Sequence, residues 1–146
     1  MRLSKRGEYA SRAMLELSLH YGEGPLHISA ISSAQDIPKR FLEQLLLILK
    51  RAGYLRSKKG PNGGYYLSKP PSKINVAEVI RVMDGPLAPI DCVSVTAYEV
   101  CPRQDFCGLR WLWKEVRDKV VEIMENTTFE DLADRTLKAR KKWNER

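Results

Sequence analysis

The residues of this chain most suited to chemistry are its three cysteines. Cys92, Cys101 and Cys107 lie within sixteen residues, and the rest of the 146-residue sequence holds none. A structural zinc site of four cysteines usually contains pairs separated by roughly two to four residues, and this spacing contains no such pair. Thiolates are soft ligands that suit iron–sulfur clusters, which a loop can wrap at irregular spacing. The cysteines therefore predict an iron–sulfur centre.

Other uses of these thiols stay open. A zinc ion is the main alternative to a cluster, a redox switch through Cys101 and Cys107 is another, and partly buried free thiols are a third. The N-terminal residues are basic but lack the apolar stretch of a signal peptide, and no apolar run could span a bilayer. We therefore expect a cytoplasmic protein, where an odd number of cysteines argues against a structural disulfide.

Enzyme signatures are missing from the sequence. It contains no glycine-rich phosphate loop and no spacing typical of a Ser/His/Asp arrangement. The two histidines, His20 and His27, lie far from the cysteines along the chain. We expect neither catalysis nor a small-molecule substrate.

Positive charge is concentrated in the first half of the chain. The net charge is +7, and residues 37–73 carry nine basic side chains against a single acid, Glu43. Residues 74–134 hold twelve acids against six bases. This segregation indicates that one part of the molecule faces a polyanion.

Helical spacing of apolar residues predicts three helices in this basic half, at about residues 4–21, 29–35 and 38–52. The proposed inward-facing stripes are Ala10, Met14, Leu17 and Tyr21 in the first helix, and Phe41, Leu45, Ile48 and Ala52, widened by Leu42 and Leu49, in the third. Two short strands, 54–57 and 65–68, flank a turn rich in glycine that predicts a hairpin.

The second half is predicted to contain a brief helix at 76–83, the cysteine loop, and a long helix at 108–125. One face of that long helix is apolar, with Leu109, Leu112, Val116, Val120 and Ile123. Thr127 or Thr128 can cap a last helix that is expected to run through Ala139, and Thr127 with Glu130 fits a capping box. We expect units at 1–71, 72–107 and 108–146.

Three helices followed by a hairpin are typical of a winged helix-turn-helix, so the predicted fold is mainly α with a small β-hairpin and a long dimerisation helix. Its third helix would enter the major groove of double-stranded DNA, where arginine suits guanine, glutamine suits adenine and a carboxylate can accept from cytosine. The hairpin would contact the phosphates or the minor groove. The candidate contacts are Lys39, Arg40, Glu43 and Gln44 in the helix, and Lys58, Lys59, Asn62 and Gly63 in the hairpin.

These segments resemble the Rrf2 family of bacterial transcription regulators. The resemblance is carried by IPKRFLEQLLLILKRAGYL, KKGPNGGYYLSKP and INVAEVIRVMDGP, together with the three cysteines ahead of a long helix. It implies a homodimer on a palindromic operator, with the long helices packed together. Some family members, of the IscR kind, hold a 2Fe-2S cluster, and others, of the CymR kind, work without one.

The resemblance also bears on the fourth cluster ligand. IscR-like members have a histidine shortly after the third cysteine, whereas this chain has Gly108, Leu109 and Arg110 there. Other relatives use an acid near the N-terminus of the partner subunit, which points to Glu8 as the fourth ligand. Glu8 could instead pair with Arg12 one helical turn later. A 2Fe-2S cluster is favoured, with 4Fe-4S as the alternative.

Overall fold

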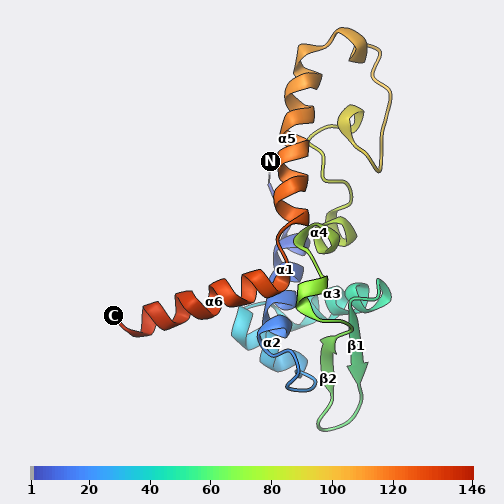
Figure 1. Ribbon diagram of the computed structural model, residues 1–146. Helices are drawn as coiled ribbons and strands as arrows, with labels where there is room; N and C mark the ends of the chain where they lie inside the picture. The colour runs from blue at the N-terminus through green and yellow to red at the C-terminus, as the bar shows by residue number, and fades with distance from the viewer. Residues whose placement is uncertain (1) are drawn as a thin grey trace.

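The computed structural model describes residues 2–146, which form a helical body, a small hairpin and two long C-terminal helices (Figure 1). The chain runs in the order α1 (Lys5–Leu19), α2 (Ile28–Gln35), α3 (Lys39–Arg51), β1 (Leu55–Lys58), β2 (Gly64–Leu67), η1 (Pro71–Lys73), α4 (Val76–Asp84), η2 (Asp91–Val93), η3 (Gln104–Phe106), α5 (Gly108–Glu125) and α6 (Phe129–Asn144). This confirms the mainly α fold with one hairpin. Within the described residues, no helix is long and apolar enough to cross a membrane.

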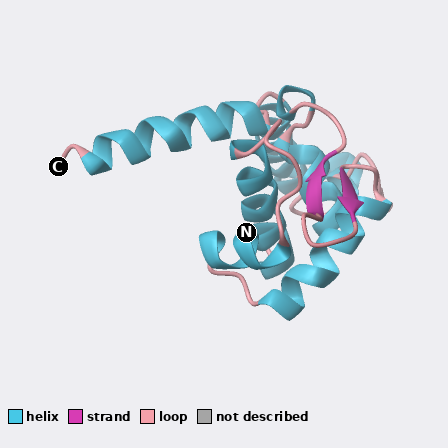
Figure 2. Cartoon of the chain, turned by 90° about the horizontal axis from the view of Figure 1, so that it is seen from below, coloured by secondary structure: helices cyan, strands magenta, loops and turns pink. Residues whose placement is uncertain are grey.

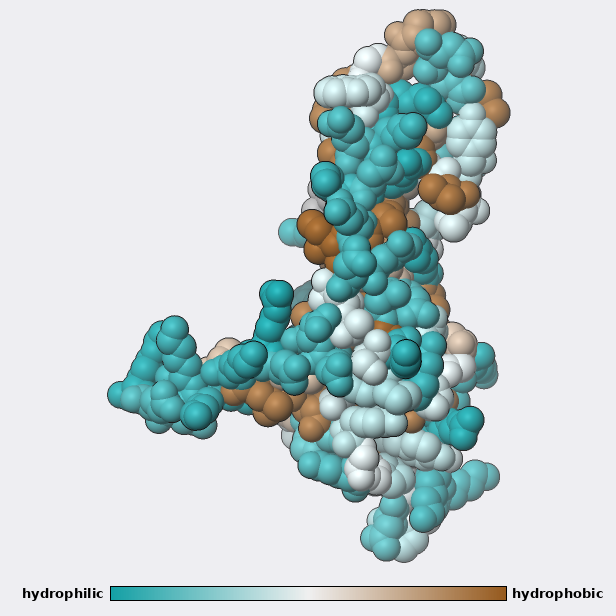
Figure 3. Space-filling model, viewed as in Figure 1, coloured by the Kyte–Doolittle hydropathy of each residue, from teal (hydrophilic) through white to brown (hydrophobic). Residues whose placement is uncertain are grey.

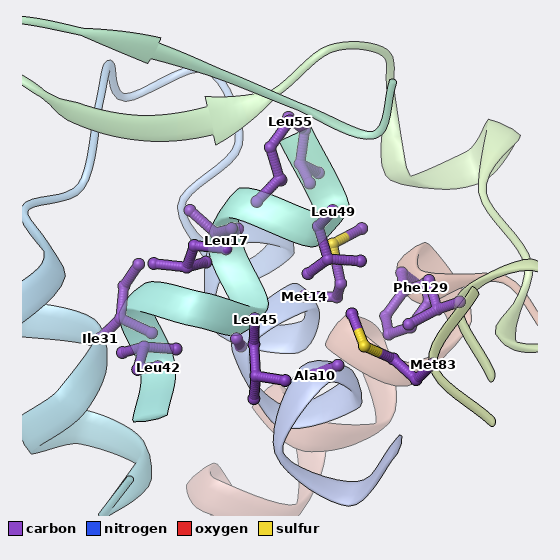
Figure 4. Close-up of a cluster of buried hydrophobic side chains, with 14 of the residues drawn as sticks. Ala10, Met14, Leu17, Ile31, Leu42, Leu45, Leu49, Leu55, Met83 and Phe129 are labelled. Atoms are coloured by element: carbon purple, nitrogen blue, oxygen red, sulfur yellow. The ribbon is translucent and has the colours of Figure 1, made fainter. Parts of the chain in front are cut away.

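The core lies where α1, α3, α4 and the start of α6 meet (Figure 4). Helix α1 begins at Ser4, whose hydroxyl accepts from the Gly7 N–H, and it buries Ala10, Met14 and Leu17 as predicted. Tyr21 was wrongly placed in that stripe. The helix ends at Leu19, before Tyr21, and the tyrosine side chain is exposed.

Helix α3 buries Leu42, Leu45 and Leu49 as predicted, but its buried stripe is shifted toward Leu46. Its fully buried residues are Leu42, Leu45, Leu46 and Leu49. Phe41 and Ile48 are half-buried and flank this stripe, whereas Ala52 lies beyond the helix and is exposed. The stripe is centred on the leucines because they face both α1 and α2 in the core, and the spacing of Leu42, Leu46 and Leu49 is itself helical.

The hairpin is displaced by one residue from the predicted strands, and its register pairs Leu55 with Leu67 and Lys58 with Gly64. Leu26, before α2, adds a bridge to Tyr65 on the outer side of β2. At Gly64 (φ +150°), a Cβ atom would lie 2.1 Å from the Leu26 carbonyl oxygen. Glycine is therefore required there for the close approach of two backbones.

Helix α5 rises from the body and α6 runs sideways from its base (Figures 1 and 2). The bounds of α5 match the predicted long helix, but none of its residues is fully buried. The joint to α6 is fixed because the Val76 N–H donates to the Thr127 carbonyl and the Phe129 N–H donates to the Ile74 carbonyl.

Two details predicted for α6 were wrong. The capping box uses Thr128 and Asp131, because the Thr127 hydroxyl donates to the Ile123 carbonyl of the preceding turn. The helix also continues past Ala139 to Asn144, since the intervening residues are mostly good helix formers.

Candidate DNA-binding face and cysteine loop

The exposed face of α3 carries the residues predicted to contact base edges. Lys39, Arg40, Glu43 and Gln44 are all exposed, opposite the buried leucines. At ~100° per residue they occupy one side of the helix together with Lys50 and Arg51. The helix therefore presents a polar, mostly basic surface on a rigid apolar base.

The turn between α2 and α3 is tightly defined. Asp36 ends α2 with a left-handed backbone (φ 50°), and its N–H donates to the Ser32 carbonyl. The Ser32 hydroxyl then donates to the Ile37 carbonyl at 2.6 Å. These bonds fix the direction in which α3 leaves the turn at Pro38, and thereby the direction of its first residues.

The hairpin is the predicted wing, and Lys58, Lys59 and Asn62 are exposed on it. Gly63 is buried instead: its N–H donates to the Gly60 carbonyl, and a Cβ atom there would lie 2.1 Å from the Lys58 carbonyl oxygen. Gly63 thus shapes the tip of the wing. Lys50 of α3 donates to the Ser57 hydroxyl at 2.6 Å, which ties the recognition helix to the wing.

The cysteines belong to the segment between α4 and the start of α5. This loop runs alongside α5 (Figure 1). All three are free thiols of intermediate exposure. Cys92 lies in η2, and Cys107 is the N-cap of α5, at the positive end of that helix dipole. Cys101 lies between them, just after an exposed stretch of the loop, and its carbonyl accepts from the Gln104 N–H.

Two arginines of α5 hold the loop near its first cysteine. Arg110 Nε donates to the Cys92 carbonyl at 3.3 Å, and Arg117 Nη1 donates to the Val93 carbonyl at 2.5 Å. Val93 and Ser94 are buried, whereas residues 95–100 are all exposed. The loop is therefore fixed to α5 near Cys92, whereas its exposed middle is held by bonds within the loop, such as the one from the Glu99 N–H to the Asp91 carbonyl.

The donor chemistry of this loop fits an iron–sulfur cluster better than its arrangement does. Three thiols on one loop supply the soft ligands that a cluster needs. Among residues 2–146, however, no three His, Cys, Asp or Glu side chains lie close enough together to hold a metal ion. Cluster binding would require the loop to close and a further donor to join it.

Glu8, the predicted fourth ligand, is engaged within its own subunit. Its carboxylate contacts Lys5 Nζ at 3.1 Å and Arg12 Nη1 at 3.5 Å. The pairing with Arg12 that the sequence left open is thus present. The histidines serve local structure: His27 Nδ1 caps α2 by accepting from the Ser29 N–H, and His20 lies between Glu16 and Glu23.

Exposed apolar side chains follow α5 on one side. Leu109, Leu112 and Ile123 are 63%, 41% and 66% exposed, and Val116 and Val120 are half-buried. Figure 3 shows hydrophobic patches among hydrophilic atoms in the region of α5. Trp111 is exposed away from this stripe, whereas Trp113 is half-buried. An isolated subunit leaves an apolar helix face in water, which marks an interaction surface.

Comparison with known proteins gives this arrangement a family. Residues 3–135 match the model of the Rrf2 family, described as an iron-dependent transcriptional regulator. The chain belongs to the Rrf2 family. It is therefore a DNA-binding transcriptional regulator and not an enzyme, as the sequence predicted.

Relatives of two kinds resemble this Rrf2 regulator to a similar degree. It is 35% identical to the regulator CymR of Bacillus subtilis over 93% of this chain and 92% of CymR. It is 36% identical to IscR of Pectobacterium carotovorum over 92% of this chain and 80% of IscR. The solved structure of B. subtilis CymR, the global cysteine regulator, superposes with a TM-score of 0.80, covering 92% of this chain and 97% of that one. IscR of T. potens gives 0.78 at 29% identity, covering 95% and 90%.

Sequence reasoning missed two features near these sites. Arg117 as an anchor of the loop has no local signal, because its partner lies 24 residues away. Glu16 does leave a local signal, because it lies beside Ala13, Met14 and Leu17 on the buried side of α1. An acid at a buried position requires a hydrogen-bonding partner.

Proposed function

We propose that this Rrf2 regulator is a homodimer that binds a palindromic operator and senses its signal through an iron–sulfur cluster on the cysteine loop. The observation that carries the proposal is the placement of three partly exposed thiols on the loop that leads into α5, a helix whose apolar stripe is uncovered. A 2Fe-2S cluster is preferred, and 4Fe-4S is the alternative.

The DNA contacts follow from the exposed surface of α3 and the wing. Arg40, Glu43 and Gln44 are proposed to read bases in the major groove, with Lys39 beside them. Lys58, Lys59 and Asn62 would contact the backbone or the minor groove. Gly63 contributes by keeping the wing tip tight.

The dimer is proposed to form through the apolar stripe of α5. Burial of Leu109, Leu112 and Ile123 against the partner helix would remove apolar surface from water at about 25 cal/mol per Å². Two recognition helices would then face half-sites roughly 34 Å apart, or a multiple of that distance. A donor from the partner, with Glu8 as the candidate, would complete the three cysteine ligands.

Metal and acid-labile sulfide analysis of protein purified without oxygen tests the cluster. We expect a coloured protein that holds iron and sulfide in similar amounts. Cys101→Ala should abolish both and leave the dimer intact by light scattering. A colourless protein that binds zinc, or one that stays free of iron after attempted reconstitution, would contradict the proposal.

A second candidate function is that of a cluster-free regulator, controlled by a partner protein or by the thiol redox state. Two observations favour this function. Among the described residues, the thiols are not gathered into a group that could hold a metal ion. The chain is also similar to CymR over nearly its whole length. In that case iron-free protein would bind its operator with full affinity, and thiol oxidation or a bound partner would change that affinity.

A further inference from the structure

A buried carboxylate joins three helices of the body. Glu16 of α1 is only 5% exposed. Its Oε2 accepts from Gln35 Nε2 of α2 at 2.6 Å, and its Oε1 lies 3.2 Å from His20 Nε2. Arg140 Nη2 of α6 lies 4.0 Å from Oε2. Because a buried charge without partners is costly, these contacts constrain the helices that supply them.

One side of this junction leads directly to the recognition helix. Gln35 is the last residue of α2, and its carbonyl also accepts from the Arg12 guanidinium. The turn 36–38 follows at once, and α3 begins at Lys39. A change in the position of Gln35 would therefore alter where the first turn of α3 lies on DNA.

The other side of the junction leads to α6. The first half of α6 is held in the core by Phe129 and Ala133, which are buried. The second half projects beyond the body (Figure 2). Arg140 belongs to this second half, and its contact with Glu16 connects the projecting part of α6 to the DNA-binding helices.

We propose that Glu16 is a positioning residue for DNA recognition, which couples the placement of α6 to that of α2 and the first turn of α3. This goes beyond the cluster proposal and depends only on DNA binding. Glu16 does not face the polar surface of α3, so its effect would be on specific recognition and not on the general attraction of the phosphates.

His20 makes this junction sensitive to pH. The pKa of His20 is raised above its ordinary value, chiefly by its hydrogen bond to Glu23, with a further contribution from Glu16 and against the effect of burial. Arg140 contacts the other carboxylate oxygen of Glu16. His20 also lines a cavity of about 470 Å³, together with Tyr21 and with Lys58 and Tyr66 of the wing.

The sign follows from the raised pKa. Protonated His20 donates from both ring nitrogens, and this stabilising contribution is fully present below the ordinary pKa of histidine. It is lost as the pH rises through the raised pKa. Specific DNA affinity that depends on the junction should therefore decline as the pH increases across this range.

The test measures the affinity of the full-length protein for a duplex that it selects from a random pool, and for an unrelated duplex of equal length. Glu16→Gln keeps the shape of the side chain but removes its charge. It should weaken binding to the selected duplex by about threefold to tenfold, a coupling of ordinary size. It should also flatten the dependence of this affinity on pH above the ordinary pKa of histidine, and leave binding to the unrelated duplex unchanged.

Arg140→Gln serves as a second variant, because its side chain is half-exposed and its loss spares the core. Lys141→Gln is the matched control, since it removes the same charge from an exposed neighbouring position of α6. We expect Arg140→Gln, but not Lys141→Gln, to reduce the preference for the selected duplex and to speed amide exchange at residues 33–36. In a Glu16→Gln background it should have no further effect.

Equal behaviour of Arg140→Gln and Lys141→Gln would overturn the inference, as would a folded Glu16→Gln protein with unchanged preference and pH profile. Failure of the wild-type protein to bind any duplex would contradict DNA binding itself, and the inference with it. If the protein stays free of iron after attempted reconstitution but Glu16→Gln has the expected effects on DNA binding, only the cluster proposal is contradicted.

Discussion

Arg117 of α5 donates a hydrogen bond to the backbone carbonyl of Val93, directly after the first cysteine of the loop. The same guanidinium contacts Asp118, and its side chain is largely buried. The position of Cys92 relative to α5 is therefore set by Arg110 and Arg117 of that helix, whereas residues 95–100 are exposed. Cys92 is thus held against α5, and the chain that follows it is more accessible to solvent.

Arg117→Ala should release the start of the loop. A hydrogen bond of this kind contributes about 1 kcal/mol, so local opening should become roughly fivefold more frequent. Alkylation of Cys92 in reduced, metal-free protein, followed by mass spectrometry, should accelerate by a similar factor. Lys119→Ala, on an exposed part of the same helix, is the control and should not change the rate. Equal rates in both variants would show that the loop is held by other contacts.

Arg40→Ala should weaken binding to the selected duplex by about 1–3 kcal/mol, because a bidentate contact to guanine would be lost. Preference at one base position per half-site should relax, while the other positions keep theirs. Binding to a set of duplexes with single substitutions measures this pattern. A uniform loss over all the duplexes would assign Arg40 to the phosphate backbone instead.

Lys59→Ala should act differently, since the wing lysine is proposed to neutralise a phosphate. Affinity should fall for every duplex, and the slope of log K against log salt should become shallower by about one per subunit. Titrations at several salt concentrations provide the slope. An unchanged slope would place Lys59 away from the DNA.

The sequence was sufficient for those parts of the fold that depend on local signals. Apolar residues at helical spacing gave α1, α3 and α5, and the glycines at 60, 63 and 64 gave the wing. Errors arose where two neighbouring residues fit the same local pattern equally well. Thr127 and Thr128 can each cap a helix, and Thr128 is the cap in the structure, where the Thr127 hydroxyl donates to the Ile123 carbonyl instead.

The candidate sites were less accessible from the sequence. Exposure of the basic residues on α3 could be expected, because the leucines opposite them had to be buried. The path of the cysteine loop could not, since it depends on contacts such as that between Arg117 and Val93, which lie far apart in the chain and leave no periodic pattern. The gathering of thiols around a metal likewise depends on geometry that spacing alone does not specify.

Ile123→Glu should disrupt the proposed dimer. A carboxylate in the apolar stripe of α5 would lose hydration on association, at a cost of about 3 kcal/mol or more, which corresponds to a dissociation constant more than about a hundredfold higher. Sedimentation analysis over a range of concentrations measures this constant. Lys114→Glu adds an acid on another face of α5 and should leave the dimer intact. Dimers of equal stability in both variants would exclude this stripe as the interface.

Thr128→Ala tests the joint between α5 and α6. The Thr128 hydroxyl accepts from the Asp131 N–H, and the Asp131 carboxylate accepts from the Thr128 N–H. Loss of the cap should lower the free energy of unfolding by about 1 kcal/mol, and the Tm by roughly 3 °C for a chain of this size. Thr127→Ala is the matched control and should cost less, because the Thr127 side chain makes only a bond within the last turn of α5.

The same cap gives a pH dependence with a definite sign. The hydrogen bonds from Thr128 lower the pKa of Asp131 below its ordinary value. Its contribution to stability is therefore present above the ordinary pKa of aspartate and is lost as the pH falls through the lowered one. The difference in Tm between wild type and Asp131→Asn should shrink in that acidic range, because the Thr128 N–H donates a hydrogen bond to the Asp131 carboxylate. A difference that stays constant from neutral to acidic pH would show that the Asp131 carboxylate takes no part in the cap.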